Sequence, residues 1–344
     1  MKALEVGFRQ TVRRALASVL AGGVLAFAAV PVAAEMSEIN VAQQYGISYL
    51  PLMLMEEQKL IEKHAKAAGV DVKVDWAKFA GGNVMNDALL SGSLQFASGG
   101  VGPFVTLWAR TRGNLDVRGV GALNSMPIHL VTRNPNVKTL ADFGPSDRIA
   151  LPAVKVSVQA VLLQMGAEQA FGPGQQNRLD PLTVTMSHPD AMQALLSGKS
   201  EIDAHFGSPP FQYQEVARPG LHVVLNSYDV LGGPATFTVV WTTAKFRNEN
   251  PKLYDAFVKA LDEATAEINR DKRAASEAYL RISKDKDSID NILKMMNDPN
   301  IVYTATPQNI MKFAEFMAKT GAIKTKPESW RDFFFPNVHS LPGS

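Results

Sequence analysis

The chain has 344 residues, no cysteine, and 35 basic against 33 acidic residues, which gives a formal net charge of +2. The lack of cysteine excludes disulfides and thiolate chemistry. Residues 1–34 hold four basic residues and one acidic residue, so the remainder has 31 basic against 32 acidic residues. This even balance gives no indication of a nucleic-acid or membrane-surface partner.

The N-terminus has the pattern of an export signal. Basic residues lie between Lys2 and Arg14, residues 15–30 carry no charge, and Val32-Ala33-Ala34 fits a small-residue cleavage site. A transmembrane anchor needs about 20 strongly apolar residues, and this run is shorter and rich in alanine and glycine. We therefore predict a signal peptide cleaved after Ala34. The Arg13-Arg14 pair leaves both the general and the twin-arginine export routes open.

The remaining chain, about 310 residues, is longer than a single core favours, so two domains are expected. In its first part the pattern predicts strands at 39–45, 72–79 and 117–123. It predicts helices from Pro51 to about Ala67, from an N-cap at Asn83 to a stop at Gly92, and over 103–110. Strands and helices therefore alternate, which is typical of an α/β fold.

The middle of the chain continues this alternation. Strands are predicted at 128–132, 148–151, 182–186, 221–225 and 237–242. Ser157 is expected to cap a helix that ends at Gly172. A second helix is expected to have His188 as its cap and Pro189 as its first residue, and to end at Gly198. From Pro251 onward the chain is predicted to be helical, over 251–269, 272–283, 287–297 and 307–319. The apolar segment 330–335 is expected to pack back on the first lobe.

One pattern occurs twice, in residues 79–104 and 186–211. Both copies contain Ala-Leu-Leu-Ser-Gly, then a strand-like run, then a loop that ends in Pro-Phe. Two copies about a hundred residues apart are too few for a solenoid and predict two lobes of the same build. Helix starts at the carboxyl edges of strands bind anions or dipoles, so two such edges that face each other form a binding cleft. Chain crossings near 125–129 and 232–239 would form a hinge.

With these residues in view, the chain resembles the nitrate/sulfonate/taurine-type substrate-binding proteins of bacterial ABC importers. The residues that carry the resemblance are FxGG, ALLSG and FASGGVGP within 79–103, Leu140–Phe143, and AMQALLSGKSEIDAH at 191–205. The resemblance implies a type II periplasmic-binding fold, two α/β lobes joined by a two-crossing hinge. Lobe 1 would comprise 35–127 plus 240–344, and lobe 2 would comprise 128–239.

The same resemblance implies a function and a location. The protein would be a periplasmic receptor, a monomer, that captures a small solute and delivers it to an ABC permease in the inner membrane. No cofactor and no nucleic-acid partner are implied. Family members hold the ligand on strand-to-helix loops, and the matching positions here are Tyr45, Gly46, Ser48, Gly81, Gly82, Asn83, Ser98, Gly99, Gly100, Val101, Lys155, Ser157, His188, His205 and Ser208.

Several of these positions have alternative interpretations. Tyr45 and Tyr49 suit either ring stacking on a ligand or packing in the core. Lys155 near the helix start at Ser157 would favour an anionic group, but a loop lysine is usually only solvated. His188 suits a helix cap, and His205 precedes a Gly-Ser-Pro-Pro loop from which it can reach the cleft.

Catalysis finds little support in the sequence. There is no GxSxG, HExxH or GxGxxG motif, and the six histidines lack metal-ligand spacing. The eukaryotic thiamine-pyrimidine synthases, relatives of the same group, carry a cysteine-rich motif that is missing here. An exported enzyme and a ligand-sensing subunit on the same scaffold remain the alternatives. The solute is left open among a sulfonate, a nitrate-like anion and a small aromatic or pyrimidine.

Overall fold

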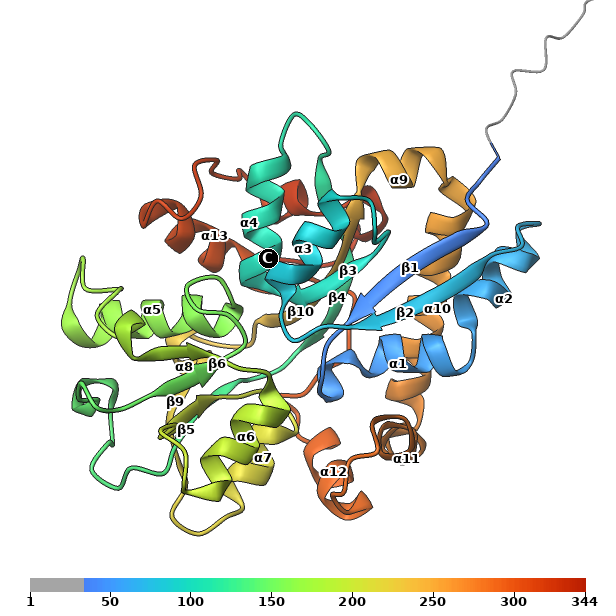
Figure 1. The fold of residues 1–344 in the computed structure, drawn as a ribbon. Coiled ribbons are helices and arrows are strands. Elements are labelled where there is room, and N and C mark those ends of the chain that lie inside the picture. The colour runs from blue at the N-terminus through green and yellow to red at the C-terminus, as the bar shows by residue number, and fades with distance from the viewer. Residues whose placement is uncertain (1–33) are drawn as a thin grey trace, which may run out of the picture. The chain divides into compact units, whose positions relative to one another are not determined.

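The computed structural model describes residues 34–344, so the predicted signal segment lies outside the described residues except for Ala34. The first sheet has two parts, the two-stranded β2-β1 and the three-stranded β3-β10-β4, which a single bridge joins in the order β2-β1-β3-β10-β4 (Figure 1). Its strands are β1 Glu38–Gln43, β2 Lys73–Lys78, β3 Ala97–Gly100, β4 Val117–Ser125 and β10 Thr236–Thr243. β1 and β2 are parallel, and β10 is antiparallel to β3 and β4. A parallel bridge between Val41 and Phe96 joins β1 to the residue before β3.

The second sheet repeats this arrangement in the order β7-β6-β8-β5-β9. Its strands are β5 His129–Thr132, β6 Ile149–Leu151, β7 Thr183–Thr185, β8 Ala204–Phe206 and β9 His222–Asn226. β6 is parallel to β7 and β8, whereas β5 is antiparallel to β8 and β9. In each sheet four strands therefore run parallel to one another, and the fourth in the order, β10 or β5, runs antiparallel to them. The prediction of two similarly built α/β halves is confirmed.

The chain passes between the two sheets twice. β5 of the second sheet follows β4 of the first after only Met126–Ile128, and β10 returns to the first sheet after the short helix α8 (Ser227–Leu231). Gly232 and Gly233 turn the chain before β10 with φ of 69° and 139°, a region that favours glycine. Both crossings lie within the predicted segments, as the type II periplasmic-binding fold requires. The lobe boundaries placed at 127/128 and 239/240 stay a prediction.

Helices cover both sheets. Around the first sheet lie α1 Leu50–Glu57, α2 Leu60–Ala67, α3 Gly82–Leu90, α4 Val101–Thr111, α9 Ala244–Glu249, α10 Pro251–Arg270, α11 Lys272–Ser283, α12 Ile289–Met296 and α13 Ile310–Lys319. Around the second sheet, α5 (Val158–Phe171) and α8 lie on one side, and α6 (His188–Ser197) and α7 (Phe211–Val216) on the other (Figure 1). The single helix predicted over 51–67 is wrong. Lys59 adopts a left-handed conformation with φ of 52°, which interrupts the helical hydrogen bonds and separates α1 from α2.

The C-terminal tail packs against the first sheet, as predicted. Trp330–Phe333 form a short 3₁₀ helix, and the backbone N–H of Phe335 donates to the carbonyl of Gly119 on β4 at 2.9 Å. The indole of Trp108 donates to the carbonyl of Asp332 at 2.8 Å. Trp241 on β10 is fully buried, as expected of a core residue. Over residues 34–344, no helix has the length and apolar character that a membrane crossing needs.

Candidate functional site

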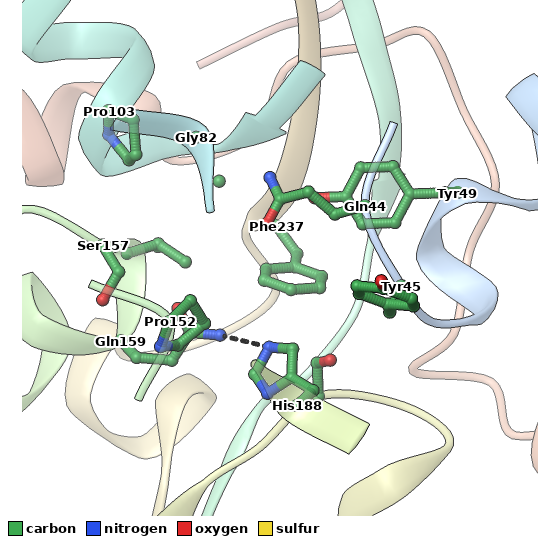
Figure 2. A pocket seen from close by; sticks show the side chains of 13 residues that line it. Gln44, Tyr45, Tyr49, Gly82, Pro103, Pro152, Ser157, Gln159, His188 and Phe237 are labelled. Atoms are coloured by element: carbon green, nitrogen blue, oxygen red, sulfur yellow. Dashed lines mark hydrogen bonds between the residues drawn. The ribbon is translucent and has the colours of Figure 1, made fainter. Parts of the chain in front are cut away.

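A small cavity lies at the carboxyl ends of β1, β2 and β3 of the first sheet and of β6, β7 and β8 of the second (Figure 2). Residues that follow β1, β2 and β3 line it from the first sheet, and residues that follow β6, β7 and β8 line it from the second. Its volume is about 20 Å³, room for about one water molecule. A larger solute therefore enters only when the two sides separate. The lining residues are Gln44, Tyr45, Tyr49, Gly82, Gly100, Pro103, Pro152, Ser157, Val158, Gln159, His188, Ser208 and Phe237.

Four helices begin at this cavity, and the two sides differ in how the helix starts are capped. On the second sheet, Ser157 caps α5 and Ser187 caps α6 through their side-chain oxygens. On the first sheet, α3 and α4 follow Gly81 and Gly100 and have no side-chain cap. The first N–H groups of a helix need partners, and at the starts of α3 and α4 no side-chain cap supplies one. The partial positive charge at a helix start favours an anion.

Two predicted caps are wrong. Gly81, not Asn83, is the N-cap of α3, because it holds the extended conformation from which the helix departs (φ −160°, ψ 155°). Ser187, not His188, is the N-cap of α6, because its hydroxyl accepts a hydrogen bond from the N–H of Asp190 at 3.4 Å. The imidazole of His188 is therefore free for other contacts. The cap predicted at Ser157 is confirmed by its hydrogen bond from Ala160 N–H at 3.2 Å.

A buried row of polar side chains leads from the cavity into the second half of the fold. Nε2 of Gln159 lies 3.2 Å from Nε2 of His188 (Figure 2), and Nδ1 of His188 lies 2.8 Å from Nε2 of His205. Nδ1 of His205 then lies 2.5 Å from Oε1 of Glu215 on α7. His205 and Glu215 are both fully buried. A carboxylate inside the fold is thus connected to the cavity through two imidazoles.

Burial determines the charge of His188. Loss of solvent lowers the pKa of its imidazole well below the ordinary value, and the neighbouring His205 lowers that pKa further. His188 is therefore neutral in the folded protein near pH 7. One nitrogen of a neutral imidazole carries a hydrogen and donates, and the other accepts. The hydrogen-bond partners of His188 therefore determine which of its two nitrogens is the donor.

Aromatic rings form part of the wall of the cavity. Tyr45, Tyr49 and Phe237 surround it on the first-sheet side (Figure 2). Tyr49 is buried, and burial raises the pKa of its phenol, which stays protonated. Tyr45 is 36% exposed and also lines a larger groove that opens beside the cavity. Opposite these rings the hydroxyl of Ser208 is buried and has no hydrogen-bond partner within the described residues, so it is available to a ligand.

The two sides of the cavity are in contact at glycine residues at the start of α4. A Cβ atom on Gly100 would lie 2.4 Å from Cγ1 of Val158, and one on Gly102 would lie 2.9 Å from the carbonyl oxygen of Val156. Real side chains do not approach so closely, so the start of α4 meets the start of α5 only because glycine stands at both positions. This is a closed arrangement of the two halves.

Six of the predicted site residues line the cavity: Tyr45, Gly82, Gly100, Ser157, His188 and Ser208. The other predicted positions, which lie outside the lining, are Gly46, Ser48, Gly81, Asn83, Ser98, Gly99, Val101, Lys155 and His205. Gly82 and Ser208, from the loops at 81–83 and 205–208, line the same cavity. Sequence reasoning missed Gln44, Pro103, Pro152, Val158, Gln159 and Phe237. Val158 and Gln159 directly follow the predicted cap at Ser157, so the helix-start argument, taken two residues further, would have found them.

The neutral state of His188 predicts a pH-dependent stability. In the unfolded chain histidine takes up a proton near pH 6.5, whereas folded His188 does so only at lower pH. Below about pH 6.5 the unfolded state therefore binds more protons than the folded state. The stability that neutral His188 contributes is fully present above that pH and decreases as the pH falls below it. Between pH 7.5 and 5.0 the decline reaches at most about 2 kcal/mol. Urea unfolding at both pH values should show a smaller decline in His188→Asn; an equal decline would contradict the assignment.

Comparisons with known proteins agree with this architecture. Residues 33–283 match the model of the NMT1-like family. No curated protein matches the sequence. The alkanesulfonate-binding protein SsuA from Xanthomonas axonopodis pv. citri, solved with MOPS, superposes with a TM-score of 0.66 at 17% identity, covering 86% of this chain and 96% of its own. The periplasmic aliphatic sulphonate-binding protein SsuA from Escherichia coli gives a TM-score of 0.62 at 18% identity, covering 88% and 99%.

The periplasmic nitrate-binding protein NrtA from Synechocystis PCC 6803 gives a TM-score of 0.63 at 15% identity, covering 87% of this chain and 85% of its own. Identities this low establish a shared fold. Together with the family match, they confirm the superfamily inferred from the motifs within 79–103, 140–143 and 191–205. In the part of the chain that the structure describes, no group of three or more His, Asp or Glu side chains is arranged to hold a metal ion.

Proposed function

The chain belongs to the NMT1-like family, and we propose that it is an exported, periplasmic receptor of an ABC importer. It binds a small solute between its two lobes, 35–127 plus 240–344 and 128–239, and delivers it to a permease in the inner membrane. The observation that carries this proposal is the convergence of the carboxyl ends of β1, β2, β3, β6, β7 and β8 on one cavity. The protein is a binding protein, it acts as a monomer, and its signal is removed near Ala34.

The solute is a small anion of the sulfonate or nitrate type. The uncapped starts of α3 and α4 offer N–H groups to it, and the hydroxyl of Ser208 adds a further polar contact. Among the lining residues no lysine, arginine, aspartate or glutamate is present, which favours a singly charged group over a polyanion. An organic portion attached to the anion would lie against Tyr45 and Phe237.

A planar ring such as a pyrimidine is the second candidate. Three aromatic side chains, Tyr45, Tyr49 and Phe237, stand around the cavity and suit stacking on a flat solute. The amide of Gln44 and the Gln159–His188 pair would then hydrogen-bond to the ring edge. Direct comparison of the two solute classes in one experiment separates these candidates.

Closure completes the site. Each side supplies half of the contacts, so a solute stabilises the arrangement in which both halves meet it. A permease that recognises the closed form would receive only the loaded protein. A ligand-sensing subunit, the alternative, would differ only in the protein to which it docks. Genes for a permease and an ATPase next to the gene for this protein would support the transport function.

Thermal melting of the purified protein tests the solute class. Nitrate, methanesulfonate, taurine and cytosine would each be added, with sodium chloride at equal ionic strength as the control. A solute at one hundred times its dissociation constant adds about 2.7 kcal/mol to stability and raises the melting temperature by several degrees. A shift with cytosine alone would favour the planar solute. No shift with any of the four solutes would contradict both the anionic and the planar solute class. Formation of a covalent product from a solute would favour an enzyme.

A further inference from the structure

The row Glu215–His205–His188 ends in the cavity and carries a buried acidic group whose ion-pair partner within residues 34–344 is His205 alone. Oε1 of Glu215 contacts Nδ1 of His205, and its second oxygen has no partner within residues 34–344. We propose that this row holds one exchangeable proton, and that the proton determines whether His188 accepts or donates a hydrogen bond in the cavity. The inference rests on the proposed function and deepens it, because it links binding of an anionic solute to uptake of a proton.

Without the proton, every hydrogen position in the row is determined by the carboxylate. An ionised Glu215 only accepts, so Nδ1 of His205 carries hydrogen and donates to it. Nε2 of this neutral imidazole is then an acceptor, so Nδ1 of His188 donates to it across 2.8 Å. Nε2 of His188 is left as an acceptor, and the amide N–H of Gln159 at 3.2 Å matches it. In this state the row carries one negative charge and offers an anion no hydrogen from His188.

One proton from solvent reverses the direction of the row. It bonds to Nε2 of His188, and the hydrogen on Nδ1 of His188 moves to Nε2 of His205. His205 is then an imidazolium against the Glu215 carboxylate, and His188 stays neutral with its hydrogen on Nε2, as its burial demands. The row is now neutral overall. His188 has become a donor toward the cavity.

In the protonated row two N–H groups face each other, the one on Nε2 of His188 and the amide of Gln159. Either the amide of Gln159 rotates to present its oxygen, or an acceptor from a solute lies between the two groups and takes both hydrogens. A sulfonate or nitrate oxygen meets this requirement. Because an anion favours the protonated row, the proton and the anion strengthen each other's binding.

The titratable groups around His188 indicate that this row, and not another group, couples proton uptake to anion binding. The titratable groups that line the cavity with it are the phenols of Tyr45 and Tyr49, on the segment that follows β1. From the elements packed behind it come His205 on β8 and Glu215 on α7. Phe211 at the start of α7 stacks on the imidazole with ring centroids 5.8 Å apart and carries no charge.

Nitrogen NMR of the histidine rings tests the row without any solute. In the wild-type protein, lowering the pH should move the hydrogen of His188 from Nδ1 to Nε2 while His205 becomes an imidazolium, in one joint step. Glu215→Gln keeps an acceptor for His205 but removes the charge, so this step should move to lower pH by at least one unit. Separate steps for the two rings, or no effect of Glu215→Gln, would overturn the proposal.

Calorimetry with methanesulfonate then tests the link to the solute. Titrations in Bis-Tris and in Tris, two amine buffers whose ionisation enthalpies differ, should reveal up to one proton taken up per anion bound. The affinity should fall up to tenfold per pH unit above the step seen by NMR. Glu263→Gln removes a matched Glu–His pair at the surface, where Glu263 lies 2.7 Å from His64, and should leave both results unchanged.

The outcomes separate the two proposals. Binding of methanesulfonate that is independent of pH and takes up no proton would overturn the proton link and leave the receptor function intact. Failure of both methanesulfonate and nitrate to bind would overturn the anion class together with the link. His188→Asn keeps a donor toward His205 but has no second ring nitrogen, so it should bind methanesulfonate without proton uptake, and retained uptake would contradict the assigned role.

Discussion

Replacing Gly100 with alanine is expected to weaken solute binding roughly 5- to 150-fold, because overpacking at a closed contact costs about 1–3 kcal/mol. The new Cβ would lie 2.4 Å from Cγ1 and 2.7 Å from Cβ of Val158. Those two residues belong to opposite sides of the cavity, so the clash disappears when the halves separate. The substitution therefore penalises the closed state and spares the open one. Titration of the solute that gives the largest melting shift measures the loss.

Two variants accompany this measurement. Gly144→Ala is the matched control, since its Cβ would meet only Oδ2 of Asp147 at an ordinary 3.7 Å, and its affinity should equal that of the wild type. Combining Gly100→Ala with Val158→Ala removes Cγ1, the atom at 2.4 Å, but keeps Cβ at 2.7 Å, so it should restore part of the affinity. Small-angle scattering with saturating solute should show a larger radius of gyration for Gly100→Ala alone. Unchanged affinity and radius would mean that the halves do not need this contact to close.

The duplicated arrangement of the fold could be predicted from the sequence because it depends on local sequence signals. Alternating apolar residues mark the strands, and Gly92 and Gly198, with φ of 80° and 64°, mark the ends of equivalent segments in the two copies. Short-range chemistry also explains the confirmed cap at Ser157. The strand orders β2-β1 with β3-β10-β4, joined by one bridge, and β7-β6-β8-β5-β9 show the similar build of the two halves that the repeat predicted.

The site was only partly predictable because side-chain direction depends on tertiary packing. Glycines and helix starts could be placed, since they bind through the backbone at strand ends. Phe237 could not, because the sequence of a buried strand does not show which cavity one of its side chains reaches. His205 shows the same limit, since its loop position predicted a side chain in the cleft. Its ring instead lies behind His188, held by a glutamate ten residues later on α7.

The helical break at Lys59 and the two mistaken caps have a related cause. A left-handed lysine carries no sequence mark, and the periodicity of 51–67 continues through it. At Asn83 and His188 a plausible cap stood one or two residues inside the true start. Local propensity fixed the existence of these helices, while the neighbouring strand end determined the residue at which each one begins.

Replacing Phe334 with alanine is expected to lower the free energy of unfolding by about 3–5 kcal/mol, the largest stability effect we predict. Phe334 is fully buried, with its ring centroid 5.5 Å from that of Phe104 and 6.2 Å from that of Trp330. A Cβ atom on Gly119 would lie 2.4 Å from its ring, so the space over β4 is shaped for this side chain. Truncation leaves a cavity between the tail and the first sheet. Urea unfolding measures the loss.

Phe171→Ala at the half-buried end of α5 is the control for removing a phenylalanine ring, and it should cost less than about 1.5 kcal/mol. Phe334 lines no part of the cavity, so solute affinity measured well below the melting temperature should be unchanged in Phe334→Ala. A comparable loss in both variants would mean that the tail adds little to the first sheet. Lost affinity in a folded Phe334→Ala protein would instead show that the tail, through β4 and the crossing that follows it at 126–128, holds the two halves in register.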